Sequence, residues 1–451
     1  MDKFTPYIDD NYQQFQDELF ELLRLPSISP VPGFEKEVQA CAAAFAEKMN
    51  AVGISAKVYQ TEGNPIVYGE TEQKEGLPTV LIYGHYDVQP EGNLDNWNSA
   101  PYEPDIRDGI IYARGVADNK GQIFSHIKAY EVYKATMGEP KVNLKYIIEG
   151  EEETGSVQLA KFAEKYADML KADITIWSDG NVHSSGRPII LCGTKGLIIV
   201  KIKVTGPCRD FHSRYTSMLP SPVWKLTTIL NSLKDVEGNV LVPGFYDGVE
   251  KPSESAIEAI RGIPGSIDDF KEMWGVDEIL HGVETLEDFY THIMYEPTLN
   301  CGCIAVGAPD GGKSIVPAEA SAWLDIRPVP AQDHKDLINK IITHIESLGI
   351  SGVEVEARGN DAAFTSLDNK FVMAATEAVR KSFNAEPVLY PAEGYSGPYF
   401  VFNNIIGAPC IMVPCSATDA NEHGPNENLP IELYKIAIHT GAELIKRFSE
   451  E

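Results

Sequence analysis

The chain has 451 residues, of which 43% are hydrophobic and 23% are charged, and its formal net charge is −28. This composition is typical of a globular protein, and the length exceeds what one ordinary hydrophobic core holds, so two domains are expected. The negative charge argues against nucleic acid as a partner, because phosphate binding needs clustered lysine and arginine.

The sequence gives no sign of a membrane or export segment. Its first residues lack the basic stretch and following apolar stretch of a secretory signal. No run approaches the roughly 20 apolar residues that cross a bilayer. The seven cysteines are odd in number and scattered, so we expect no disulfide framework and a cytoplasmic location. We interpret Cys301 and Cys303 as small buried thiols on a strand, since no second pair completes a zinc site.

The first part of the chain alternates between helical and extended patterns. Apolar residues recur at helical spacing in some segments, and short apolar runs between turn residues predict strands in others. Helices are expected at 7–25, 34–50, 123–130 and 156–170, the last capped by Ser156; strands are expected at 54–58, 65–68, 79–83, 142–148 and 174–177, with a polar loop at 96–108. This order predicts an α/β fold: a mostly parallel sheet with helices on both faces.

The pattern changes near Gly193. Strands at 196–205, 315–326 and 353–357 with helices at 223–233 and 333–348 predict an α+β unit that has its own antiparallel sheet. Residues 238–294 are an acidic insertion with only weak helical patterning. Helical patterning returns near residue 369, and a last buried strand is expected at 409–413. We therefore predict one domain from residues 1–193 and 362–451, with a second domain, 194–361, inserted into it.

Side chains that can bind metal follow the predicted strands of the first domain. They are His85 and Asp87 after the run 79–83, Glu152 and Glu153 after 142–148, Asp179 after 174–177, and His423 after the strand-like run 409–413, with Asp118 in the segment 114–121. The carboxyl ends of parallel strands meet at one edge of a sheet, which is where α/β folds place their chemistry. We expect these side chains to converge there.

Each of these pieces alone has an ordinary structural explanation. A histidine and an aspartate two residues apart are common in turns, and the acidic run 151–153 suits the first turn of a solvated helix. The sequences at 118–119 and 179–181 suit turns, and the polar loop 421–426 fits a plain surface. Only the combination indicates a metal centre. Two imidazoles with several carboxylates suit zinc, cobalt or manganese, whereas magnesium and calcium prefer oxygen ligands alone.

Formal charge favours two ions over one. Three ligating carboxylates and a bridging hydroxide balance two divalent ions, but they would leave a single ion in a strongly negative site. Paired ions roughly 3.5–4 Å apart can hold a bridging water, lower its pKa and stabilise the oxyanion that forms. One further carboxylate must move the proton of that water to the leaving group. We expect one of Glu152 and Glu153 to bind metal and the other to face the water, while Asp87 orients His85.

Five motifs in these regions resemble the M20 family of metallopeptidases, and most closely its carnosinase-type dipeptidases. They are residues 84–90, 115–121, 152–156, 178–179 and the loop at His423. The resemblance implies a zinc-exopeptidase-like fold with an inserted lid and dimerisation domain. It also implies that Asp118 bridges two metal ions, that His85 and Asp179 complete one site and Glu153 and His423 the other, and that Glu152 is the general base and acid.

The same resemblance implies a homodimer and several substrate contacts. His212 matches a histidine that reaches the partner subunit's active site and stabilises the oxyanion, and Arg327 matches an arginine that holds the substrate's carboxylate. Gly394, Ser396 and Gly397 match a glycine-rich loop at the substrate's C-terminus, and Ser314 stands where relatives carry Asn or Thr. Arg214 and Tyr395 stand where glycine is usual. From the residues alone, His212 and Arg327 fit ordinary surface ion pairs.

The leading hypothesis is a two-metal hydrolase that cleaves an amide bond in dipeptides or short peptides with a free C-terminal carboxylate. Zinc is the first expectation for the metal, with manganese and cobalt as alternatives. An alternative enzyme is an N-acyl amino acid deacylase of the acetylornithine or succinyl-diaminopimelate type. A second alternative is a catalytically silent binding protein, against which Glu152 argues because a binding protein needs no proton shuttle.

Overall fold

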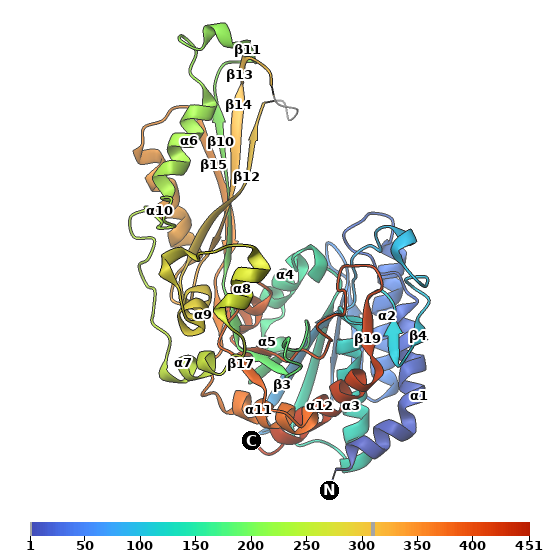
Figure 1. The fold of residues 1–451 in the computed structure, drawn as a ribbon. Coiled ribbons are helices and arrows are strands. Elements are labelled where there is room, and N and C mark those ends of the chain that lie inside the picture. The colour runs from blue at the N-terminus through green and yellow to red at the C-terminus, as the bar shows by residue number, and fades with distance from the viewer. Residues whose placement is uncertain (1, 308–311) are drawn as a thin grey trace.

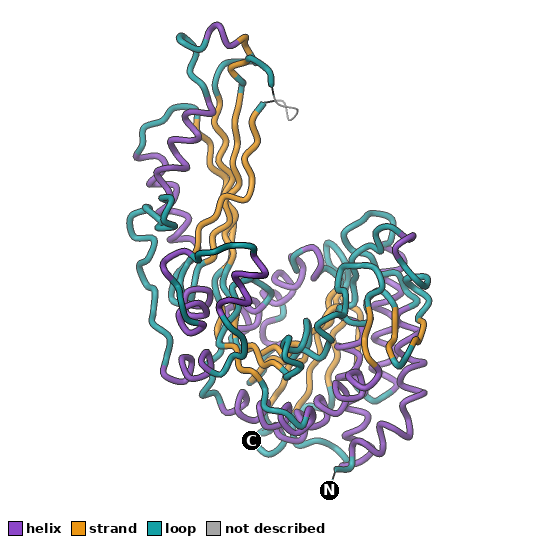
Figure 2. Tube along the Cα trace, in the orientation of Figure 1, coloured by secondary structure: helices purple, strands orange, loops and turns teal. Residues whose placement is uncertain are grey.

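The computed structural model describes residues 2–307 and 312–451, which form a broad α/β body and a long arm that rises from it (Figure 1). Both chain termini lie in the body, and segments from the middle of the chain form the arm. The body and the arm each have their own sheet, and helices surround the sheet of the body (Figure 2).

An eight-stranded sheet forms the centre of the body. In spatial order its strands are β1 (Ser55–Tyr59), β2 (Ile66–Glu70), β6 (Asn143–Glu149), β3 (Thr79–His85), β7 (Ile174–Trp177), β18 (Cys410–Met412), β8 (Ile189–Leu191) and β17 (Val388–Tyr390). The central strands β6, β3, β7 and β18 run parallel to one another, while β1 and β2 are antiparallel at one edge. The predicted fold class, a mostly parallel α/β sheet, is confirmed.

Helices cover both faces of this sheet. On one face lie α1 (Phe4–Leu23), α2 (Glu35–Ala51), α3 (Lys120–Met137), α11 (Lys370–Phe383) and α12 (Ile431–Phe448). On the other lie α4 (Val157–Lys165), α5 (Ala167–Leu170), α7 (Glu254–Arg261), α9 (Leu286–Tyr295) and the π-helix η5 (Val401–Ile406). Alternate residues of β3 enter the two hydrophobic cores on either side of the sheet. Val80 and Ile82 pack in the core under the first group of helices, and Leu81 and Tyr83 pack in the core under the second. A strand buried on both faces is expected to be mostly apolar, as β3 is from Val80 to Tyr83.

The arm is a four-stranded antiparallel sheet with helices on one face. Its strands, in spatial order, are β12 (Thr298–Val306), β14 (Glu319–Arg327), β10 (Leu197–Thr205) and β15 (Val353–Asn360), and its helices are α6 (Pro222–Leu233) and α10 (His334–Ser347). The far tip holds β11 (Phe211–His212), η3 (Ser213–Tyr215) and β13 (Ile315–Val316) (Figure 1). Where the arm joins the body, β9 (Gly193–Thr194) pairs with β16 (Ala363–Phe364).

The remaining elements are short. They are η1 (Leu94–Asn96), β4 (Asp105–Arg107), β5 (Ile110–Tyr112), η2 (Glu152–Thr154), α8 (Ile267–Trp274), η4 (Leu280–Gly282) and β19 (Asn428–Pro430). Strands β19, β5 and β4 form a small sheet, so the segment 96–108 is not only a loop as predicted. No helix in the described part of the chain combines the length and the apolar character that crossing a membrane requires.

The acidic insertion 238–294 is more regular than its sequence predicted. It contains α7, α8 and α9, and a side chain caps the first turn of each: Ser253, Ser266 and Thr285. These caps satisfy amide groups that a short helix otherwise leaves unpaired. Each helix has only eight to ten residues. A helix of this length offers few apolar positions, so the segment as a whole shows only weak helical patterning although three helices form within it.

Three other local predictions were also wrong. The run 315–326 is two strands, because Pro317 lacks an amide hydrogen for the ladder and separates β13 from β14. Ser156 precedes α4 in a left-handed conformation (φ 54°) and its side chain caps nothing, and the helix breaks at Tyr166. Cys301 and Cys303 lie on β12 but are exposed, because β12 is an edge strand with few covered positions.

Candidate metal centre

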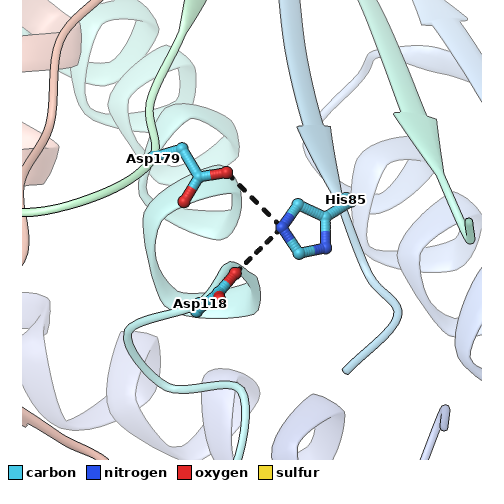
Figure 3. A group of neighbouring side chains, drawn as sticks. All are labelled: His85, Asp118 and Asp179. Atoms are coloured by element: carbon cyan, nitrogen blue, oxygen red, sulfur yellow. Dashed lines mark ion pairs between the residues drawn. The ribbon is translucent and has the colours of Figure 1, made fainter. Parts of the chain in front are cut away.

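The first candidate ligand is the last residue of β3. His85 is completely buried, and its Nδ1 lies 3.1 Å from the carbonyl oxygen of Asp87 and 3.2 Å from Asp87 Oδ1. These contacts orient the ring so that Nε2 points the other way. There Nε2 lies 3.0 Å from Asp118 Oδ1 and 3.5 Å from Asp179 Oδ2 (Figure 3). Asp118 belongs to the segment before α3, and Asp179 follows the end of β7.

A second cluster shares Asp118 with the first. Asp118 Oδ2 lies 3.0 Å from His423 Nε2, and Glu153 Oε2 lies 3.1 Å from the same nitrogen. In each cluster the three ligand atoms lie within 4.8 Å of one another. The structure therefore brings together all five predicted metal ligands, in two groups of three that meet at one aspartate.

His423 reaches this cluster from a position the sequence did not predict. Strand β18 ends at Met412, so His423 does not follow the end of a strand directly. It lies in the long loop between β18 and β19 and has a left-handed backbone (φ 60°), with 57% of its side chain exposed. The expectation that a strand end delivers this histidine was wrong.

The charges at the centre shift the proton affinities of its side chains. Burial alone would raise the pKa of Asp118, but the imidazoles of His423 and His85 hold it below its ordinary value. The neighbouring carboxylates of Asp118 and Glu153 raise the pKa of His423 to about 10. Burial opposes protonation of His85, yet the aspartates around it raise its pKa well above the ordinary value. The carboxylates thus form a strongly negative site that attracts positive charge.

The donor set fits divalent metal ions. Imidazole nitrogens and carboxylate oxygens are the ligands that zinc and related ions take. His85 Nε2 is buried and makes no hydrogen bond to any described residue, although it faces two carboxylates.

A third group of possible ligands, Asp333, His334 and Asp361, lies in the arm and is not a free donor set. There His334 Nδ1 is 2.8 Å from Asp361 Oδ1, and Asp333 caps α10, so its polar atoms already have partners.

Glu152 lies beside the centre but in neither group of ligand atoms. It begins the single turn η2 after β6, and its amide donates to Asp87 Oδ1 at 3.3 Å, while the amide of Glu153 donates to Asp87 Oδ2 at 3.2 Å. Asp87 therefore holds both His85 and this turn. Burial and the carboxylates of Asp179 and Asp118 raise the pKa of Glu152 well above its ordinary value, against the opposing effect of His85. Cations bound at the centre would offset this rise.

The glycine-rich loop 393–398 adjoins the metal centre. A Cβ on Gly397 would meet the Trp177 ring at 3.0 Å, and Trp177 Nε1 donates to Asp179 Oδ2 at 3.1 Å. Ser396 Oγ donates to the carbonyl oxygen of Lys195 at 2.7 Å, where the arm joins the body. A Cβ on Gly394 would meet Ile293 of α9 at 3.0 Å, so this part of the loop packs closely against the insertion.

Arg327 lies at the same junction of arm and body. It is the last residue of β14, and the carbonyl oxygen of the next residue, Pro328, accepts from the amide of Gly196. Arg327 Nε is 3.7 Å from Asp325 Oδ1, a weak ion pair that leaves the rest of the guanidinium available.

His212 and Ser314 are not brought to the metal centre within one chain. His212 belongs to β11 and Ser314 precedes β13, and the amide of Ser213 donates to the Ser314 carbonyl oxygen at 2.8 Å. Both therefore lie at the far tip of the arm, which points away from β3 and the body (Figure 1).

Four contacts to the ligands come from residues that the sequence did not single out. Gln89 Nε2 donates to Glu153 Oε2 at 2.9 Å, and the Asn119 side chain joins the His85 amide to the Ser178 carbonyl oxygen. Trp177 Nε1 donates to Asp179, and Glu427 accepts from the Asp118 amide. Gln89 and Asn119 lie inside the motifs, so their position was a usable signal. Trp177 and Glu427 gave none, because their roles depend on tertiary contacts.

Comparison with known proteins places the chain among peptidases. A sequence profile described as Peptidase family M20/M25/M40 matches residues 81–447. The human protein named Beta-Ala-His dipeptidase is 29% identical over 456 aligned residues, covering 95% of this chain and 89% of the relative. The Saccharomyces cerevisiae Cys-Gly metallodipeptidase DUG1 is 26% identical, covering 98% and 97%. The crystal structure of the M20 family metallo-carboxypeptidase Sso-CP2 from Sulfolobus solfataricus superposes with a TM-score of 0.87 at 32% identity, covering 97% and 99%.

Proposed function

The chain belongs to peptidase family M20/M25/M40 and is a metallopeptidase, and we propose that it hydrolyses dipeptides and other short peptides with a free C-terminal carboxylate. The observation that carries the proposal is the pair of three-residue ligand groups that share Asp118, with Glu152 next to them but outside both. Relatives named as a dipeptidase, a metallodipeptidase and a metallo-carboxypeptidase support the substrate class.

Two divalent cations fit this centre, with zinc as the first candidate and manganese or cobalt as alternatives. His85, Asp118 and Asp179 would hold one ion, and Asp118, Glu153 and His423 the other. When bound, such a pair activates a water molecule and stabilises negative charge on the substrate's carbonyl oxygen.

The protein's own residues supply the proton transfer. Glu152 takes a proton from the attacking water on its carboxylate and delivers it to the leaving amine nitrogen. Asp87 keeps His85 in one orientation and fixes the turn that carries Glu152 through the amide contacts at 3.2–3.3 Å. The position of Glu152 outside both ligand groups supports this division of roles.

Arg327 and the loop 393–398 are the proposed binding site for the substrate's C-terminus. A guanidinium can grip a carboxylate with two parallel hydrogen bonds. Ser396 and Gly397 place the loop between the arm junction and Trp177, which contacts the metal ligand Asp179. A carboxylate held at this junction while the amide lies at the metals leaves room for few residues between them, so short peptides are favoured.

We further propose that the enzyme works as a homodimer through the arm. His212 and Ser314 lie at the far tip, so they can contribute to catalysis only if the tip reaches a metal centre in a second chain. Large apolar side chains near the tip and on α6 are exposed, namely Tyr215, Met218 and Trp224. A second chain that covered these side chains would remove their apolar surface from water. In the dimer, His212 would stabilise the oxyanion in the partner's site, with Ser314 beside it.

A cytoplasmic location is part of the proposal. All seven cysteines are free thiols, including the exposed Cys208, Cys301 and Cys303, which suits a reducing compartment. The net charge of −28 argues against nucleic acid as a partner, because phosphate binding needs clustered lysine and arginine.

A substrate panel tests the proposed activity. Metal-stripped protein is re-supplied with zinc, manganese or cobalt and assayed with unmodified dipeptides, with the same dipeptides amidated at the C-terminus, and with acetyl- and succinyl-amino acids. We expect turnover of the unmodified dipeptides only after metal is restored, and much slower turnover of the amidated ones. Preferred cleavage of acyl-amino acids would identify a deacylase instead, and binding without turnover of any substrate would indicate a silent binding protein.

A further inference from the structure

A buried carboxylate and a buried guanidinium lie behind the metal centre. Glu427 immediately precedes β19 and is completely buried, and Arg114, between β5 and α3, is 1% exposed. Arg114 Nη1 donates to Glu427 Oε2 at 2.7 Å. The two residues are 313 positions apart in the sequence, so the pair joins two distant loops of the body.

The carboxylate of Glu427 accepts four hydrogen bonds. Besides Arg114, Oε2 accepts from the amide of Gly115 at 2.9 Å, and Oε1 accepts from the amides of Ala117 and Asp118 at 2.9 and 3.0 Å. Successive backbone amides that point at one anion form a concave anion-binding site. Since the last amide belongs to Asp118, Glu427 fixes the backbone of the residue that both ligand groups share.

The guanidinium of Arg114 contacts the two other ligand-bearing loops. Its Nη2 donates to the carbonyl oxygen of Gly424 at 3.0 Å and to that of Pro90 at 3.3 Å. Gly424 follows His423 directly, and Pro90 closes the turn that begins with His85. The pair therefore contacts the segments that carry three of the five ligands.

We propose that Arg114 and Glu427 are positioning residues that set the spacing of the His85, Asp118 and His423 segments, and thereby set the affinity of the centre for its metal ions. This inference rests on the proposed function. Neither side chain is in a ligand group, so each acts through the backbone it holds. Residues that orient metal ligands in this indirect way typically change metal affinity or activity by 10–100-fold when replaced.

A purely structural role does not explain the pair equally well. Burying two charges is costly, and an apolar pair of similar volume is often as stable or more stable. A pair kept only for packing would not need five further polar contacts, and all five here go to backbone groups of ligand-bearing segments. The rigid planar fork of arginine serves the carboxylate from Nη1 and the two carbonyl oxygens from Nη2, whereas the donors of a lysine ammonium all lie on one nitrogen and do not reach acceptors so far apart.

The first test is the Glu427→Gln variant, with Glu443→Gln as its matched control. The amide keeps the shape of Glu427 but turns one acceptor atom into a donor, so two of the four hydrogen bonds are lost. Glu443 on α12 is also a buried carboxylate, 1% exposed, and it pairs with Lys381 away from the ligand groups. For each variant, the affinities for the first and the second zinc ion are measured by chelator competition. The melting temperature is measured on metal-free protein.

We expect Glu427→Gln to bind zinc 10–100-fold more weakly, while Glu443→Gln binds it like the unsubstituted protein even where its melting temperature falls equally. Equal zinc affinity of Glu427→Gln and the unsubstituted protein would overturn the inference. Should Glu427→Gln fail to fold, Arg114→Lys carries the test, because it keeps the charge but releases Gly424 or Pro90. It should weaken zinc binding and lower kcat at unchanged KM, and unchanged affinity would again overturn the inference. An unsubstituted protein that binds fewer than two zinc ions would overturn the proposed function itself.

Discussion

Three consecutive glutamates give the sharpest test of how the centre divides its roles. Glu153 belongs to a ligand group, Glu152 lies beside both groups, and Glu151 Oε1 accepts from the amide of Asn64 at 2.7 Å. Replacing each by glutamine changes one carboxylate to a neutral side chain of the same size. We expect three different outcomes from three neighbouring positions.

The magnitudes follow from these contacts. A positioned general base contributes about 10²–10⁴-fold to the rate, so Glu152→Gln should lower kcat by that factor, about 2.7–5.5 kcal/mol in activation free energy. It should keep both metal ions, because its carboxylate is not a ligand. Glu153→Gln removes a ligand and should lose more metal affinity than the roughly 10–100-fold typical of indirect contacts. Glu151→Gln keeps its acceptor atom for the Asn64 amide. Its kcat should stay within about twofold of the parent rate, which corresponds to about 0.5 kcal/mol in activation free energy.

The assay combines metal content after dialysis with steady-state kinetics on one dipeptide. Glu151→Gln is the matched control for a lost negative charge in the same turn. Full turnover by metal-replete Glu152→Gln would refute its role as base. Retention of both ions by Glu153→Gln at undiminished affinity would refute the second ligand group.

Three further predictions concern the arm, the junction and the core. The Glu152→Gln and His212→Ala variants should each be nearly inactive alone. A mixed dimer of the two should regain activity, because one of its two active sites then has both Glu152 and His212. No recovery of activity after subunit exchange would argue against an active site built from two chains. Arg327→Met should lower kcat/KM for dipeptides by about 10–150-fold, from the loss of about 1.5–3 kcal/mol of charge-assisted hydrogen bonding, and should leave C-terminally amidated dipeptides unaffected; an equal loss for both substrates would contradict its contact with the carboxylate. Burial lowers the pKa of His126 from 6.5 to about 4. Between these two pH values the His126 imidazole is therefore neutral in the folded protein, whereas in the unfolded chain it takes up a proton. Stability should therefore fall as the pH drops from 6.5 towards 4, by up to about 3 kcal/mol, and His126→Gln should flatten this part of a melting-temperature profile; an unchanged profile would contradict it.

The metal ligands could be predicted because their signal is local. His85 and Asp179 come directly after apolar runs, or within two residues of their end, and parallel strands bring such positions to one edge. The same local pattern gave the central strands, whose burial on both faces produces mostly apolar runs. His423 was identified from its motif and placed in a polar loop, but the separation of that loop from the end of the last strand was not foreseen.

The features that the sequence missed depend on distant contacts or short elements. The helices of the insertion are short, and their stability comes from caps and from packing on the body. Arg114 and Glu427 carry no joint signal, since 313 positions separate them. The remoteness of His212 from the metal centre follows from the length of the arm, which no single motif encodes.

Diffraction from crystals grown with zinc, with anomalous data at the zinc edge, would examine the dinuclear centre most directly. We expect two peaks per chain, one among His85, Asp118 and Asp179 and one among Asp118, Glu153 and His423. They should lie roughly 3.5–4 Å apart with a carboxylate of Asp118 between them. A single peak, or two peaks that do not share Asp118, would contradict this assignment.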